Sequence, residues 1–174
     1  MNYGVIKKTD VADGPGVRVS IFVSGCTHHC KGCFNPETWD FAFGSPYTDA
    51  TEHEILEALD HSYIRGFTFL GGEPMEPENR PTVLSLCRRI RNRFPDKEIW
   101  CYTGYLFDED LLKWAKTDEI VAELLTMIDV FVDGEFVLEK KNLKLKFRGS
   151  ENQRIIDVKE SMKKGEVVII EDPK

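Results

Sequence analysis

Four short runs rich in β-branched and aromatic residues recur along the chain, and each is closed by a glycine-containing turn. They fall at 17–24, 66–70, 98–102 and 128–132. The last three begin about 30 residues apart, which is the length of a strand, a helix and a second parallel strand. Between them, apolar residues recur at helical spacing, as in 80–94. The sequence therefore predicts an α/β fold with a mostly parallel sheet.

The length limits how this sheet can close. A complete β/α barrel of eight units needs about 250 residues, and this chain has 174. We therefore expect one domain, residues 1–174, with the fold of a partial, open TIM-like β/α barrel. In such sheets the ligand sites lie at the carboxyl ends of the strands.

Three of the five cysteines, Cys26, Cys30 and Cys33, lie within eight residues directly after the first run. A disulfide framework normally uses an even number of cysteines, so a metal or an iron–sulfur cluster is the better interpretation. Structural zinc usually takes two separated pairs of ligands; no second pair exists, although His28 or His29 could supply a fourth ligand in a strained loop. An iron–sulfur cube takes four thiolates, so three would leave one iron open for a substrate.

Other turns should meet the cysteine loop at the same edge of the sheet. Gly71-Gly72-Glu73-Pro74 follows the second run, 103–105 the third, and Asp133-Gly134 the fourth. Two glycines allow a ligand to approach the backbone, and Glu73 offers a carboxylate. The simpler interpretation of this tetrapeptide is a tight turn between a strand and a helix.

Three further residues are best explained without a functional role. Arg18, at the start of the first run, is predicted to be an exposed edge charge. Cys87 shares an apolar helix face and Cys101 lies within a strand, so both are predicted to be core residues.

Composition excludes several partners. The net charge of −7 opposes binding to the phosphate backbone of nucleic acids. No apolar stretch approaches the about 18 residues of a membrane span, and residues 1–10 lack the pattern of a signal peptide. We expect a cytoplasmic protein, where cysteines stay reduced, with no nucleic-acid or membrane partner.

The cysteine spacing resembles the signature of the radical S-adenosylmethionine superfamily. With further motifs, the chain from about residue 2 to 154 resembles the activating subunits of anaerobic (class III) ribonucleoside-triphosphate reductases. These motifs are 13–18, 26–35 with Trp39, 71–74, 100–105, 132–134 and 148–153. The residues after Arg154 lie outside the resemblance.

The resemblance implies a role for each matched residue. Cys26, Cys30 and Cys33 would ligate a [4Fe–4S] cluster, whose open iron would bind S-adenosyl-L-methionine. The cofactor's adenine would lie along Gly32, Cys33 and Phe34, although many members of the superfamily carry an aromatic residue where this chain has Gly32.

The other end of S-adenosylmethionine is assigned in the same way. Its amino group would meet Gly71, Gly72 and Glu73. Asp133 would reach the ribose or the methionine end.

The resemblance also implies a reaction. A donor such as flavodoxin would reduce the cluster, S-adenosylmethionine would be split to a 5′-deoxyadenosyl radical, and this radical would generate a glycyl radical on the large subunit of the reductase. No acid–base pair is needed, because the cofactors carry the chemistry.

Alternatives remain open at this stage. The chain could activate another glycyl-radical enzyme such as pyruvate formate-lyase, act on a small molecule as 7-carboxy-7-deazaguanine synthase does, or be a zinc-stabilised interaction module. The oligomeric state is open between a monomer and a homodimer.

Overall fold

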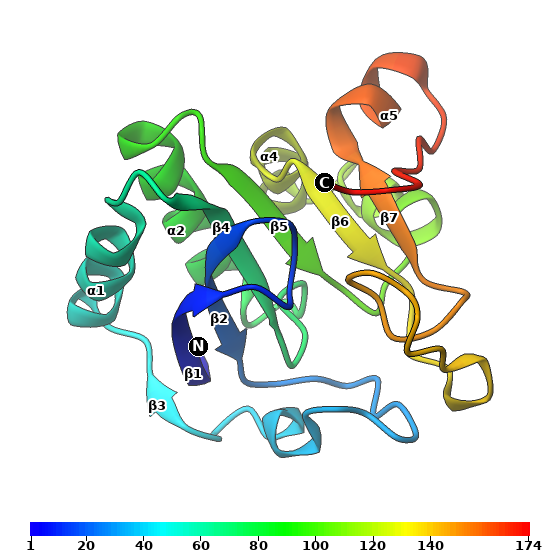
Figure 1. The fold of residues 1–174 in the computed structure, drawn as a ribbon, viewed down its shortest axis with the longest axis horizontal. Coiled ribbons are helices and arrows are strands. Elements are labelled where there is room, and N and C mark those ends of the chain that lie inside the picture. Colours follow the sequence, from blue (N-terminus) through cyan, green and yellow to red (C-terminus); the bar gives the residue numbers. More distant parts are fainter.

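A computed structural model describes all residues from 1 to 174 and contains one sheet of seven strands in the order β3-β1-β2-β4-β5-β6-β7 (Figure 1). The four central strands β2, β4, β5 and β6 are parallel, and β1, β3 and β7 pair antiparallel at the two sides. The strands span β1 Asn2–Asp10, β2 Val17–Val23, β3 Ser45–Pro46, β4 Ile64–Gly71, β5 Glu98–Tyr102, β6 Val130–Asp133 and β7 Arg154–Asp157.

The prediction of an α/β fold with a parallel central sheet is confirmed, but the barrel is not. The sheet stays open, with β3 and β7 as its two edges. The physical reason is the antiparallel pairing of both flanks: β1 folds back on β2, and β7 folds back on β6. Neither flank continues the parallel β/α succession that a barrel requires.

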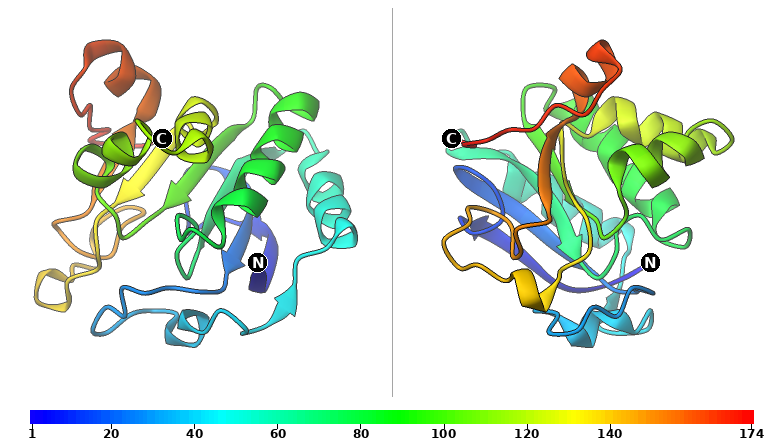
Figure 2. Two further views of the ribbon diagram at one scale, coloured as in Figure 1. Left: turned by 180° about the vertical axis from the view of Figure 1, so that it is seen from behind. Right: turned by 90° about the vertical axis from the view of Figure 1, so that its right-hand side faces the viewer.

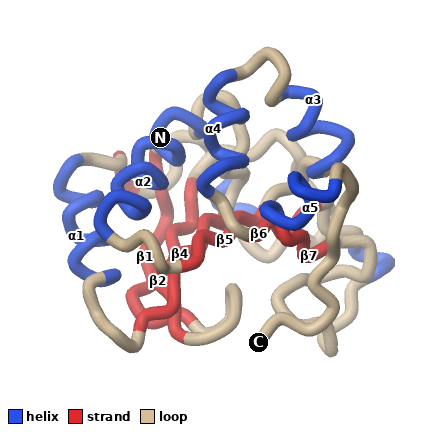
Figure 3. The backbone as a smooth tube through the Cα atoms, turned by 90° about the horizontal axis from the view of Figure 1, so that it is seen from above, coloured by secondary structure: helices blue, strands red, loops and turns tan.

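The main helices lie together on one face of the sheet, as two further views show (Figures 2 and 3). They are α1 Asp49–Leu59, α2 Arg80–Arg93 and α4 Glu119–Met127. Short elements complete the fold: 3-10 helices at Pro36–Trp39 and Leu138–Lys140, a π-helical turn at Phe107–Leu111, α3 Leu112–Trp114 and α5 Val158–Lys164. No helix is long and apolar enough to cross a membrane.

Side chains of the central strands alternate between two faces of the sheet. Phe67, Phe69 and Cys101 are fully buried in the large core beneath the helices, and Cys87 of α2 joins them there. The predictions for Cys87 and Cys101 are confirmed. The opposite face carries a smaller cluster formed by Trp100, Val130, Val132 and Ile155. That second face supports the cavity described below.

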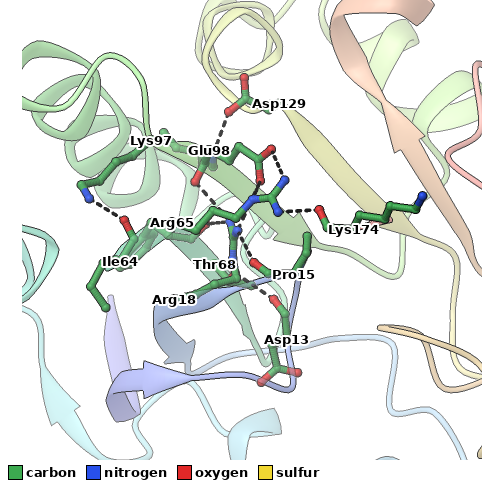
Figure 4. A network of polar contacts seen from close by, with 12 residues as sticks. Asp13, Pro15, Arg18, Ile64, Arg65, Thr68, Lys97, Glu98, Asp129 and Lys174 are labelled. Carbon is green, nitrogen blue, oxygen red and sulfur yellow. Dashed lines mark hydrogen bonds and ion pairs between the residues drawn. The ribbon is translucent and has the colours of Figure 1, made fainter. Parts of the chain in front are cut away.

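Arg18 is not the exposed edge charge that the sequence predicts, because its side chain is fully buried (Figure 4). Its Nε donates to Thr68 Oγ1 at 2.8 Å, and its Nη2 donates to the carbonyls of Phe67 and Glu98 at 3.0 and 3.1 Å. The Glu98 carboxylate lies 3.4 Å from Nη1. Burial lowers the pKa of Arg18 to about 10, so the guanidinium stays charged at neutral pH. Arg18 therefore joins β2, β4 and β5.

Candidate functional site

The cysteine loop leaves the carboxyl end of β2 and is held there by main-chain hydrogen bonds. Gly72 N–H donates to Val23 O at 2.7 Å, and Glu73 N–H donates to Gly25 O at 2.8 Å. On the other side, Cys26 N–H donates to Trp39 O at 3.2 Å. The end of β4 and the 3-10 helix therefore hold the start of the loop between them.

Two glycines make this close packing of backbones feasible. Gly71 has φ of +104°, a conformation that side chains rarely adopt. A Cβ at Gly72 would lie 2.7 Å from Gly25 O and 2.8 Å from Thr38 O. The sequence predicts that the glycines at the end of β4 admit a ligand; in the structure they admit the cysteine loop.

Side chains from the turn after β4 hold the same loop. Glu76 Oε1, on a residue that is 4% exposed, accepts hydrogen bonds from Thr27 N at 2.8 Å and from Thr27 Oγ1 at 2.6 Å. Asn79 Nδ2 donates to Ser24 O and Glu73 O. Neither residue can be predicted from the sequence, because nothing local indicates that a turn near residue 76 meets a loop near residue 27.

A cavity of about 610 Å³ opens at the carboxyl ends of the central strands. The structure brings most of the predicted site residues to its wall, together with Thr103, Gly104 and Gly134 from the neighbouring turns. The predicted residues that line it are Cys26, Cys30, Cys33, Phe34, Gly71, Gly72 and Glu73. The expectation that these turns share one rim is therefore confirmed, whereas Gly32 and Asp133 are absent from the wall.

All three loop cysteines are free thiols. Burial raises the pKa of Cys26 to about 11 and also raises the pKa of Cys30. Asn35 N–H donates to Cys33 Sγ at 3.4 Å. No His, Cys, Asp and Glu side chains are already grouped as a metal site. Metal binding would therefore remove protons from the thiols and draw them together, as is usual for thiolate sites.

His28, between the first two cysteines, is occupied at both ring nitrogens. Nε2 lies 3.1 Å from Glu73 Oε2, and Nδ1 lies 2.8 Å from Glu135 Oε1. Burial alone would lower the pKa of His28, but the hydrogen bonds to Glu73 and Glu135 outweigh it and raise the pKa to about 9. His29 stacks on Trp39 with ring centroids 4.7 Å apart and does not line the cavity. Neither histidine is placed as a fourth ligand beside the thiols.

Glu73 is 1% exposed and is fixed by several donors at the cavity wall. Its Oε1 accepts from Met75 N at 2.8 Å and from Thr103 Oγ1 at 2.9 Å. Its Oε2 accepts from Gly104 N at 2.7 Å. These hydrogen bonds hold the carboxylate in one orientation, in a buried position at the cavity wall.

Asp133 and Gly32 have positions other than those expected. Asp133 is fully buried and pairs with Arg154 at 2.6 Å while accepting from Phe107 N at 2.8 Å. Gly32, with φ of +76°, packs beside Leu138, which a Cβ at Gly32 would approach to 2.9 Å. Asp133 therefore holds the π-helical turn, and Gly32 lets the cysteine loop turn against the segment after β6.

The 148–153 motif folds the loop that covers the other side of the cavity. Gln153 Oε1 accepts from Gly149 N at 2.8 Å and from Ser150 N at 3.0 Å, and Gln153 Nε2 donates to Gly134 O at 3.1 Å. Arg148 Nη1 donates to Gln153 O at 2.6 Å. The motif therefore connects this loop to the turn after β6.

A pair of carboxyl groups, those of Asp10 and Asp13, lies at the end of β1 and in the turn that follows it. Burial raises the pKa of Asp13 to about 7, with a further contribution from the hydrogen bond and charge of Asp10. For Asp10, burial opposes ionisation, but hydrogen bonds from Asp13, Ser20 and the Ala12 amide lower its pKa. Lys7 is the nearby cation. Asp13 also lines the cavity, so below neutral pH the pair shares one proton.

Asp13→Asn tests this pair through stability. An unfolded Asp loses its proton near pH 4, whereas Asp13 in the fold keeps it to about pH 7, so ionisation costs the wild type stability as the pH rises through that window. Because Asn donates to Asp10 without ionising, Asp13→Asn should raise the unfolding free energy by about 1–2 kcal/mol at about pH 8 and by much less at about pH 5.

Urea unfolding at both pH values measures this effect. The matched control is Asp96→Asn, which removes an exposed carboxylate outside the pair. An Asp13→Asn gain that is equal at both pH values would contradict the shared proton.

Comparison with known proteins gives consistent matches. Residues 12–156 match the family model described as a 4Fe-4S single cluster domain. Three relatives are named anaerobic ribonucleoside-triphosphate reductase-activating protein. The one from Vibrio cholerae is 43% identical over 89% of this chain and 97% of its own length, and the one from Escherichia coli K12 is 41% identical over 88% and 96%. The one from Enterobacteria phage T4 is 42% identical over 89% and 93%.

Proposed function

We propose a function from one premise: this chain belongs to the family of anaerobic ribonucleoside-triphosphate reductase-activating proteins with a 4Fe-4S single cluster domain. The proposed function is to generate a glycyl radical on the large subunit of that reductase. The family resemblance inferred from the motifs is confirmed by these relatives. The reductase is then both the partner and the substrate of this protein.

The observation that carries the proposal is the donor set at the cavity. Three free thiols from one loop, those of Cys26, Cys30 and Cys33, line a cavity, and neither neighbouring histidine is placed to add a fourth ligand. A closed zinc site needs four ligands. A [4Fe–4S] cube held by three thiolates keeps one iron free for S-adenosylmethionine, so the donor set fits the cluster.

When bound and reduced, the cluster would supply the electron that splits S-adenosylmethionine into methionine and a 5′-deoxyadenosyl radical, which takes a hydrogen atom from the target glycine. The residues of this chain hold and orient the cofactor. Gly71, Gly72 and Glu73 would hold the methionine amino group, because the Glu73 carboxylate is buried and fixed at the wall. Phe34 would support the adenine.

Residues behind the wall would act indirectly. Gly32 gives the turn that presents Cys33 and Phe34. Asp133 is paired with Arg154, so we assign it to positioning the turn at Gly134 instead of direct contact with the ribose or the methionine end.

The setting of the reaction follows from the same proposal. Free cysteines that serve as ligands need a reducing compartment, which we propose to be the cytoplasm. We propose a low-potential protein such as flavodoxin as the electron donor. Activation of a pyruvate formate-lyase type of enzyme would use the same site, and the relatives favour the reductase.

Anaerobic reconstitution tests this function against the zinc-stabilised module. We expect about four iron and four sulfide per chain, and formation of 5′-deoxyadenosine from S-adenosylmethionine after reduction. A protein that takes up about one zinc and no sulfide, or that never splits S-adenosylmethionine, would contradict the proposal.

A further inference from the structure

The segment from residue 138 to residue 149 is basic in an acidic protein. It carries five basic residues and one acidic residue, whereas the whole chain has a net charge of −7. Its four lysines, Lys140, Lys141, Lys144 and Lys146, are all exposed. Lys146 pairs with Asp172 at 2.6 Å, but Lys140 and Lys144 have no carboxylate partner. Most of this local positive charge is therefore not neutralised by ion pairs within the fold.

Exposed apolar side chains gather at the same place. Leu143 is 85% exposed, Phe34 59% and Leu138 37%, and they are three of the eight large hydrophobic residues that the chain exposes. Phe34 and Leu143 line the cavity, while Leu138 packs on the cysteine loop at Gly32. We call the surface formed by these three residues with Lys140, Lys141 and Lys144 the cavity rim.

The parts of the cavity rim are connected to one another. Lys141 Nζ lies 5.3 Å above the ring of Phe34, and Phe34 contacts Phe136 with ring centroids 5.1 Å apart. In two views the segment after β6 runs beside the cysteine loop (Figures 1 and 2). The cavity rim therefore faces solvent directly next to the three thiols.

The segment behind the cavity rim is fixed in place. Tyr102 OH donates to Phe147 O at 2.7 Å, and Glu151 N–H donates to Lys140 O at 2.9 Å. Asn142 Nδ2 donates to Glu151 Oε1 at 2.9 Å. The hydrogen bonds from Gly149 N and Ser150 N to Gln153 Oε1 hold the end of the segment. A preorganised surface loses little entropy when it binds a partner.

We propose that the cavity rim docks an acidic segment of the reductase large subunit, which places an apolar side chain on Leu138 and Leu143, beside Phe34. The inference rests on the proposed function, because it names the surface by which that partner reaches the site. Charge complementarity selects the occupant: unpaired lysines around an apolar centre suit a segment with carboxylates around an apolar residue. Such a segment would bring its neighbouring residues to the cavity mouth.

The test is the double variant Lys140→Glu/Lys144→Glu, with Lys159→Glu/Lys163→Glu on α5 as the matched control. All four lysines are exposed and lack a carboxylate partner. Figure 1 shows that α5 lies at one end of β7 and the segment that carries the cavity rim at the other end. The readout is the Kd for the purified reductase large subunit at low salt and at about 0.15 M salt. We expect the rim variant to bind about tenfold more weakly at low salt, through slower association, with a smaller difference at higher salt.

Leu143→Ser tests the apolar part of the cavity rim and should weaken binding about tenfold at both salt concentrations, since it removes buried apolar contact. Wild-type Kd values for the rim variant, or equal weakening in the α5 control, would overturn the docking surface.

Cleavage of S-adenosylmethionine by the rim variant without the reductase should stay at the wild-type rate. A wild type that splits no S-adenosylmethionine would instead overturn the proposed function. The two failures are therefore distinguishable, because each appears in a different assay.

Discussion

Cys26→Ala, Cys30→Ala and Cys33→Ala are each expected to abolish the iron–sulfur cluster and the cleavage of S-adenosylmethionine. All three thiols line one cavity, His28 is engaged by two carboxylates and His29 stacks on Trp39, so neither histidine is placed to replace a lost thiolate. Iron and sulfide per chain should fall from about four to near zero after anaerobic reconstitution. The measurement is chemical analysis of iron and sulfide, together with the absorption of the reconstituted protein.

Cys87→Ala and Cys101→Ala are the matched controls. Both residues are fully buried in the core beneath the helices. Each variant should lose about 1 kcal/mol or more of stability by leaving a small cavity, while keeping the wild-type content of iron and sulfide. Loss of the cluster in Cys87→Ala to the same degree as in Cys33→Ala would show that the ligands are assigned wrongly.

Arg18→Met is expected to cause the largest loss of stability in the chain. The substitution removes the hydrogen bonds that Arg18 donates to the buried Thr68 hydroxyl, the buried Phe67 carbonyl and the partly buried Glu98 carbonyl. Removing one partner from a buried charged network typically costs about 3–5 kcal/mol. Urea unfolding of the cluster-free protein measures this loss.

Arg65→Met supplies the comparison within the same network (Figure 4). Arg65 pairs with Glu98 at 3.1 Å, but its side chain is 41% exposed. Because exposed ion pairs contribute about 0–1 kcal/mol, this variant should unfold close to the wild type. Equal losses in Arg18→Met and Arg65→Met would contradict the importance of burial at Arg18.

The parts that the sequence predicts correctly are those with a local signal. The run 98–102 becomes β5 at the same residues, and 80–94 becomes α2 with a difference of one residue at its end. The cysteine spacing and the turn at 71–74 are likewise local patterns, and the structure brings them to one cavity because parallel strands end at one edge.

The parts that the sequence does not predict depend on contacts between distant residues. The sequence predicts an exposed charge at Arg18 because its hydrogen-bond partners, Thr68 and Glu98, lie 50 and 80 positions away. The attachment of Thr27 to Glu76 is equally non-local. The same holds for the antiparallel flanks: no local pattern indicates that β1 folds back on β2, so the sequence predicts a partial, open barrel. In each case the local sequence does not indicate which distant residue or strand makes the contact.

If three thiols hold a cluster with one open iron that splits S-adenosylmethionine, as we propose, the reductase must acquire a glycyl radical. Electron paramagnetic resonance of the reduced, reconstituted protein mixed with S-adenosylmethionine and the reductase large subunit detects this radical. We expect a glycyl-radical signal on the reductase, which is absent when Cys33→Ala replaces the wild type. A reductase that remains without this radical, although the cluster is present and reduced, would show that the proposed function is wrong.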